Sequence, residues 1–401
     1  MPAIYPFSAW RYNPRRITDL ATVVSPPYDV VSASDREKLG KRSPYHFAHI
    51  ILPDGPEAEK YHRAAAYLDR WIDENILNWD EHPAIYILEQ TFDIQDQTYR
   101  RTGIVCEIAL EPMGTGILPH EETIPKHVTD RFRLMTATRA NTGQIFMSYQ
   151  DDSRAVETLH AACRSEPPEM DFTLDDVRYR VWAIRSASNI HHLQTVLGRT
   201  PAIIADGHHR YQTALRYFRE HPDIKGSDRV MVTLVNANDP GMQVLPTHRI
   251  INSDLAPQIV IERLRTVMPV EPVSDISEAT AFLKHDATRV GLVYGPSQQA
   301  WVLTPKSSSD DLDVTIFHHT VLPQGFQLDT TTPEGLAHIS YLRGTSDPMD
   351  FIRQGDFTWL GLIRPPSLSQ VFEMAGRRRT MPQKSTYFFP KVYSGFLFRR
   401  F

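Results

Sequence analysis

The residues with the clearest chemical potential form the segment Asp206-Gly207-His208-His209-Arg210. An apolar run at residues 202–205 precedes it and has the character of a short strand, and the spacing of apolar residues predicts a helix at residues 211–220. The start of a helix exposes backbone N–H groups and a partial positive charge, which suits a phosphate. The segment therefore predicts an anion site at a strand–turn–helix junction.

Each residue of this segment brings a different chemistry. Gly207 lets the backbone approach a ligand closely, and His208 and His209 add side-chain donors. Arg210 is able to bind a phosphate through two parallel hydrogen bonds. Asp206 suits a magnesium ion or the orientation of a histidine, although an aspartate that caps the helix is an equally good interpretation. The sequence contains neither a Walker loop nor a GxGxxG motif, so the common nucleotide folds are not indicated.

Two further segments contain acidic residues that are candidates for proton transfer. In Ser-Pro-Pro-Tyr-Asp-Val, two prolines stiffen the chain before Asp29, which is able to accept a proton from a hydroxyl or to make an Asx-turn. His120 and Glu121 begin a polar segment that predicts either a phosphate-contacting loop or a solvated one. It is not the helical zinc motif, because residue 124 is isoleucine and not histidine.

A fourth segment lies near the end of the sequence. Lys384, Ser385 and Thr386 combine an ammonium group with two hydroxyls, a set of donors that suits phosphate or the carboxylate of a substrate. A basic strand without a ligand is the alternative.

The elements that must position these residues belong to a chain of 401 residues, which predicts two or three domains. Strand and helix patterns alternate, and a helical pattern extends over residues 57–79. We place the domain boundary near residue 250, giving a core at residues 1–250 and an α/β lobe at residues 251–401 that contributes the Lys384 segment to the site.

Composition excludes several classes of protein. The chain has 43 basic and 48 acidic residues and a net charge of −5, which argues against binding to bulk nucleic acid or an anionic membrane. No apolar run is long enough to cross a bilayer, no signal-peptide pattern is visible, and the two cysteines cannot form a disulfide framework. These features predict a cytoplasmic, soluble protein.

Five motifs occur in order along the chain: SPPYDVVS, HEETIPKHVTDR, ADGHHRYQTAL, LPTHRII and MPQKSTYFFPKVYSGF. On these motifs, the chain resembles the bacterial and archaeal domain-of-unknown-function family ten-fifteen. That family is similar to the ParB/sulfiredoxin-like superfamily, whose members bind nucleotides at a histidine- and arginine-containing turn before a helix. The resemblance implies an α/β (α+β) fold, with a ParB/sulfiredoxin-like nucleotide-binding core and a second mixed α/β lobe.

Free serine kinases in the same superfamily carry a similar Asp-Gly-His turn and convert L-serine to O-phosphoserine. The resemblance therefore implies a kinase of a small hydroxyl metabolite, with ATP or ADP as donor and Mg²⁺ as cofactor. The nucleotide would contact residues 206–210 and His120, and Asp206 would hold the metal. Asp29 or Glu121 would act as the base and His208 as a catalytic group.

The acceptor's carboxylate would be held by Arg249 together with the Lys384-Ser385-Thr386 segment. Two alternatives stay open: a ParB-like nucleotide-binding switch without kinase activity, and a non-catalytic interaction protein. The acidic net charge and the lack of a helix-turn-helix with a basic recognition helix argue against a DNA-binding form of the first.

Overall fold

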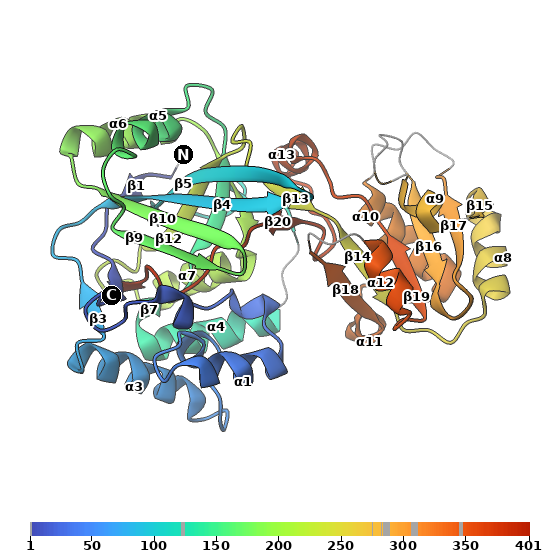
Figure 1. Ribbon diagram of the computed structural model, residues 1–401, viewed down its shortest axis with the longest axis horizontal. Helices are drawn as coiled ribbons and strands as arrows, with labels where there is room; N and C mark the ends of the chain where they lie inside the picture. Colours follow the sequence, from blue (N-terminus) through green and yellow to red (C-terminus); the bar gives the residue numbers. More distant parts are fainter. Residues whose placement is uncertain are drawn as a thin grey trace. The chain divides into compact units, whose positions relative to one another are not determined.

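The computed structural model describes residues 2–121, 125–274, 276–281, 283, 289–305, 312–344 and 348–401. It divides into two compact units (Figure 1), which are described separately. The first unit contains residues up to Gln243 together with Pro390–Phe401, and the second contains Val244–Phe389. The chain thus leaves the first unit and returns to it at the end.

The division differs from the boundary that we placed at residue 250. Strand β14 (Thr247–Ile251) pairs with two strands of the second unit, so the segment before residue 250 already belongs to that unit. The last residues differ as well, because β21 (Arg399–Arg400) pairs with β7 (Ala140–Asn141) of the first unit. Composition does not change at either point, which is why the sequence gives no signal there.

The first unit is built on a mixed sheet. Its strands follow the order β6 (Ile117–Leu118), β11 (Ala202–Asp206), β8 (Ile145–Tyr149), β12 (Arg229–Asn236), β5 (Gln97–Ala109), β4 (Ile85–Ile94), β10 (Val177–Ile184) and β9 (Met170–Leu174), and β1 (Ile4–Tyr5) also pairs with β5. The pairs β11–β6 and β12–β8 are parallel and the others are antiparallel. Alternate residues such as Ile85 and Ile87 enter one core, as the period of a strand requires.

Helices cover this sheet. In Figure 1 it lies between α5 (Ala155–Cys163) and α6 (Ala187–Leu197) on one side, and α1 (Ala33–Arg42), α3 (Lys60–Asp73) and α4 (Pro125–Thr138) on the other. Helix α7 (His208–Glu220) packs against α4. The remaining elements are short: β2 (Trp10–Tyr12), paired with β3 (Leu77–Trp79), η1 (Leu20–Thr22), η2 (Tyr28–Val30) and α2 (Ala48–Ile51).

The helical pattern over residues 57–79 is longer than the helix that forms. Helix α3 ends at Asp73, and Asn75 then adopts a left-handed backbone with φ of 56°. A left-handed residue interrupts the helix, and strand β3 begins two residues later, at Leu77. The prediction of a helix up to residue 79 is therefore wrong in its last six residues.

The second unit also combines a sheet with helices. Its strands follow the order β15 (Val270–Val273), β17 (Gln299–Leu303), β16 (Val290–Tyr294), β19 (Trp359–Leu362), β14 and β18 (Ile339–Arg343). Strands β13 (Gln243–Leu245) and β20 (Tyr387–Phe389) form a separate pair. Its helices are α8 (Pro257–Val267), α9 (Ile276–Ala281), α10 (Asp313–Ile316), the π-helical η5 (Phe317–Phe326), α11 (Pro333–Ala337), α12 (Pro348–Gln354) and α13 (Leu368–Gly376), with the 3-10 turn η4 (Gly295–Ser297).

The predicted α/β class is confirmed, because both units combine sheets with helices. Within the described residues, no helix meets the length and apolarity that a membrane span requires.

Candidate functional site

The predicted strand–turn–helix is present in the first unit. Strand β11 ends at Asp206, and helix α7 begins at His208. Gly207 occupies the cap position with φ of 102°, a conformation that an L-amino acid with a side chain rarely adopts. As a glycine, Gly207 has no side chain with which to cap the helix. The strand, the turn and the helix that the sequence predicted are therefore present at these residues.

Asp206 is held by two cations. Arg210 Nη2 lies 2.5 Å from one carboxylate oxygen, and Lys391 Nζ lies 2.8 Å from the other. The exposed fractions of these side chains are small: 16% for Asp206, 12% for Arg210 and 8% for Lys391. Arg210 Nη1 also donates to the carbonyl oxygen of Gln144. The guanidinium of Arg210 is thus fixed in orientation at the first turn of the helix.

This pairing bears on the expected metal site. Because both oxygens of Asp206 face cations, a magnesium ion would have to displace Lys391 or Arg210 to bind there. The described residues contain no group of three acidic, histidine or cysteine side chains arranged to hold a metal ion. The residues present do not fit magnesium in this arrangement.

His208 connects the helix to the predicted loop. Its Nε2 accepts hydrogen bonds from the backbone N–H groups of His120 at 3.2 Å and Glu121 at 3.4 Å. Its ring meets the ring of His120 edge to face, with centroids 4.8 Å apart. Burial and the neighbouring His120 lower the pKa of His208 to about 3, so the imidazole is neutral at pH 7. In this geometry His208 positions the loop and supplies no positive charge to a phosphate.

The other histidine of the turn makes a similar contact. The rings of His209 and His127 lie 5.2 Å apart, and His127 belongs to α4. Burial lowers the pKa of His120, although Glu121 opposes the shift. The start of α7 therefore contacts His120 through His208 and His127 through His209. Residues 122–124 of the HEETIPKHVTDR motif lie outside the described residues.

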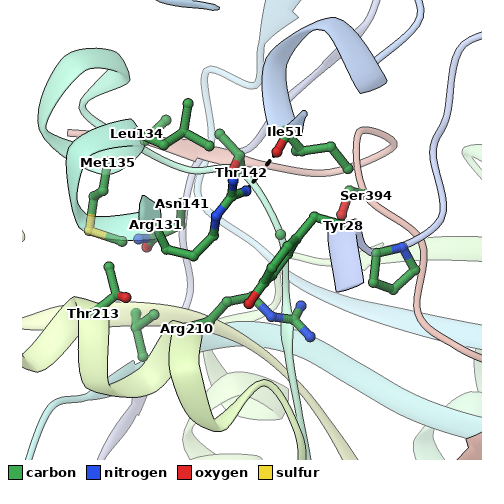
Figure 2. A pocket seen from close by; sticks show the side chains of 14 residues that line it. Tyr28, Ile51, Arg131, Leu134, Met135, Asn141, Thr142, Arg210, Thr213 and Ser394 are labelled. Atoms are coloured by element: carbon green, nitrogen blue, oxygen red, sulfur yellow. Dashed lines mark hydrogen bonds between the residues drawn. The ribbon is translucent and has the colours of Figure 1, made fainter. Parts of the chain in front are cut away.

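A cavity of about 510 Å³, part of it open to solvent, lies beside this turn. Arg210 and Thr213 of α7, Arg131 of α4, Tyr28 of η2 and Ser394 of the last segment are among the residues that line it (Figure 2). The Arg131 guanidinium lies 4.2 Å from the centre of the Tyr28 ring, a cation–π contact. Arg131 also donates to the carbonyl oxygen of Ile51 at 2.6 Å.

Asp29 shares the electrostatic environment of this cavity. Burial and the charge of Asp29 raise the pKa of Tyr28 to about 12, and the charges of Arg131 and Arg210 oppose that rise. The same tyrosine hydroxyl is thus exposed to the field of Asp29, Arg131 and Arg210. Two of the segments selected from the sequence, one containing Asp29 and one containing Arg210, meet at one cavity.

The fourth segment belongs to the second unit. Arg249, Lys384, Ser385 and Thr386 belong to the second unit, so their predicted contribution to the site stays a prediction. Arg249 is 1% exposed and donates from Nε to His318 Nε2 at 3.1 Å. Ser385 Oγ donates to the carbonyl oxygen of Pro382 at 2.5 Å.

Sequence reasoning missed Lys391, Tyr28 and Arg131 as site residues. Lys391 lies 185 positions from Asp206, so no local pattern connects them. Tyr28 adjoins Asp29 in the SPPYD motif, and Arg131 ends the HEETIPKHVTDR motif. The aromatic and basic residues of those motifs, and not only the acidic ones, were the signal that could have identified Tyr28 and Arg131.

The family described as "Protein of unknown function (DUF1015)" matches residues 4–323, most of the chain. The chain belongs to this family. The resemblance drawn from the five ordered motifs is therefore confirmed, although the last motif lies beyond the matched residues. No curated protein matches the chain.

Solved structures similar to this family member include a free serine kinase in complex with AMP, with 15% identity, a TM-score of 0.39, and coverage of 68% of this chain and 83% of that one. A variant of a free serine kinase in complex with ADP has 13% identity, a TM-score of 0.39 and the same coverage. A conserved hypothetical protein from Pyrococcus furiosus has 14% identity and a TM-score of 0.38, and the match covers 70% of this chain and 92% of that one.

Proposed function

We propose that the protein transfers a phosphoryl group from ATP or ADP to a small hydroxyl metabolite, with L-serine, which would give O-phosphoserine, as the first acceptor to test. One observation carries the proposal: Tyr28, next to Asp29, and Arg210, in the Asp-Gly-His turn, line the same cavity. A carboxylate for proton transfer and donors for a phosphate are the two components that such a reaction requires.

The donors are arranged for a nucleotide's phosphates. Arg210 is held by the Gln144 carbonyl and by Asp206, so its fork needs little reorganisation when a phosphate arrives. The start of α7, where the cap residue Gly207 has no side chain, presents backbone N–H groups at the same turn. Arg131, fixed by Asp130 and by the Ile51 carbonyl, supplies a second guanidinium at the same cavity.

In the proposed reaction, the acceptor's hydroxyl oxygen attacks the terminal phosphorus of the nucleotide. The bond from that phosphorus to the bridging oxygen breaks, and the shortened nucleotide leaves with the electron pair. Asp29 accepts the hydroxyl proton, and Glu121 is the second candidate for this role. Arg210 and Arg131 stabilise the negative charge on the transferring group, the effect that dominates catalysis of phosphoryl transfer.

Two measurements test the proposal: calorimetric titration with ATP, ADP and AMP, and a nucleotide-turnover assay with L-serine and other small hydroxyl compounds. Arg210→Ala should lower turnover by two or more orders of magnitude, about 3 kcal/mol in the transition state. Asp29→Asn should bind nucleotide nearly as well as the wild type and transfer no phosphoryl group, because a base acts on the acceptor and not on the donor.

Arg216→Ala is the matched control for Arg210→Ala. Arg216 also lies on α7 and also pairs with a carboxylate four positions away, Glu220, but it is 42% exposed and does not line the cavity. Nucleotide binding that weakens in Asp29→Asn would make Asp29 a donor ligand and move the base to Glu121. Nucleotide binding without turnover for any acceptor would reject the kinase and leave the nucleotide-binding switch.

A further inference from the structure

A second charged cluster lies on the sheet of the first unit, away from the elements that line the cavity. Its centre is Glu89 on β4, which is 1% exposed. In the sheet register, Glu89 lies between Arg180 on β10 and Thr102 on β5. Residues directly opposite on neighbouring strands present their side chains to the same face, so these three share one surface. His160 of α5 reaches the same place, with its Nε2 3.3 Å from Glu89 Oε2.

Three guanidinium groups surround this single carboxylate. Arg180 takes Glu89 Oε1 through two nitrogens, with Nε at 2.8 Å. The Nε atoms of Arg164 and Arg100 lie 3.5 and 3.6 Å from Oε2. Burial lowers the pKa of His160 to about 4, Glu89 opposes the shift, and the three arginines add to it. His160 is therefore neutral at pH 7, and the cluster carries two positive charges in excess.

The terminal nitrogens of Arg100 and Arg164 are available to a ligand. Among the residues that the structure describes, neither side chain has any hydrogen bond or ion pair other than its approach to Glu89. The two side chains are 51% and 37% exposed, so solvent reaches them. Both Nε atoms lie close to one carboxylate oxygen, and an anion of the size of phosphate is therefore able to contact both guanidinium groups.

Neutralising Glu89 explains the position of Arg180 but not the positions of Arg100 and Arg164. Arg180 already binds the carboxylate in a forked geometry, whereas Arg100 and Arg164 lie beyond normal hydrogen-bond distance from it. Three guanidinium groups around one carboxylate leave a net positive charge, which a bound anion would offset. We propose that Arg100, Arg164 and Arg180 form a second anion site, which binds a dianion such as phosphate or the phosphate group of a small phosphorylated compound.

The site is tested on the full chain by calorimetric titration with inorganic phosphate, and with glycerol phosphate as a simple phosphomonoester. Arg100→Ala and Arg164→Ala should each weaken phosphate binding at this site by about tenfold, since each removes charge-assisted hydrogen bonds. The double variant should lose the site. Both side chains are at the surface, so these variants should fold, which circular dichroism checks.

Arg178→Ala is the matched control. Arg178 lies on β10, two residues from Arg180, and is 53% exposed, but Asp171 neutralises it through contacts of 2.9 and 2.6 Å. Arg178→Ala should leave phosphate binding at this site unchanged. Tighter binding of glycerol phosphate than of inorganic phosphate would identify an organic phosphate as the ligand, and binding of inorganic phosphate alone would identify the free ion.

The inference is overturned if millimolar phosphate does not bind, or if Arg210→Ala removes all phosphate binding while the Arg100 and Arg164 variants titrate like the wild type. The kinase proposal depends on turnover and on Arg210, whereas this site depends on Arg100 and Arg164. Either proposal can therefore be refuted while the other is supported.

Discussion

The ion pair between Arg210 and Asp206 should contribute measurably to the stability of the first unit. At a charge separation of about 4 Å and an effective dielectric constant of about 20, the attraction is about 4 kcal/mol before desolvation and side-chain ordering are subtracted. The two side chains are only 12% and 16% exposed, so solvent screens the pair incompletely. Contacting residues have coupling energies of about 0.5–3 kcal/mol, and we expect a value in that range here.

Replacing either Arg210 or Asp206 should lower the free energy of unfolding by more than the coupling energy of the pair. Arg210→Ala leaves the Gln144 carbonyl without this donor and leaves Asp206 with Lys391 as its remaining cation among these three residues. A loss of about 2–3 kcal/mol in the free energy of unfolding is expected. Asp206→Asn should cost a similar amount, because Arg210 and Lys391 then face each other without the carboxylate charge between them.

A double-mutant cycle measures the coupling directly. The wild type, Arg210→Ala, Asp206→Asn and the double variant are unfolded in urea, and tryptophan fluorescence together with circular dichroism follows the transition. The double variant should be less destabilised than the sum of the single variants by the coupling energy. Additivity within about 0.5 kcal/mol would refute the reasoning, because it would mean that the two side chains do not interact in solution.

Two further predictions concern the same turn. The pKa of His208 is about 3 in the folded protein and near 6.5 when unfolded, so its contribution to stability is present above pH 6.5 and is lost as the pH falls toward 3. His208→Gln should flatten the dependence of Tm on pH between 7 and 4.5, and an unchanged slope would contradict this. Gly207→Ala forces a side chain into φ of 102° and places Cβ 3.0 Å from Arg210 Nε, which should lower the free energy of unfolding by about 1–3 kcal/mol in urea titration.

Local features of the fold were accessible to sequence reasoning. The apolar run before Asp206, the glycine after it and the amphipathic pattern that follows each depend on residues within a few positions, and together they predicted β11, the turn and α7. Helix α1 also begins at a local signal, because Ser32 caps it by accepting a hydrogen bond from the N–H of Asp35. Each pattern is decided by neighbours in sequence.

Features that depend on distant segments were not accessible. Tyr28 meets Arg131 across about a hundred residues, and Lys391 reaches Asp206 from the far end of the chain. The helical period continues past Asp73, yet the pairing of Leu77 with Tyr12 decides that this segment is a strand. Tertiary pairing overrides local propensity in such places, and a single sequence contains no record of it.

The return of residues 390–401 to the first unit has a consequence for the order of events during synthesis. The ribosome must make all of residues 244–389 before this segment exists, which takes roughly 7–30 s at typical elongation rates. Throughout that time Arg101 lacks the carbonyl of Pro390, and Asp206 lacks the ammonium group of Lys391. The turn that the proposal assigns to phosphate is therefore completed late, after the second unit has emerged, and the nascent first unit cannot acquire its final charge arrangement before then.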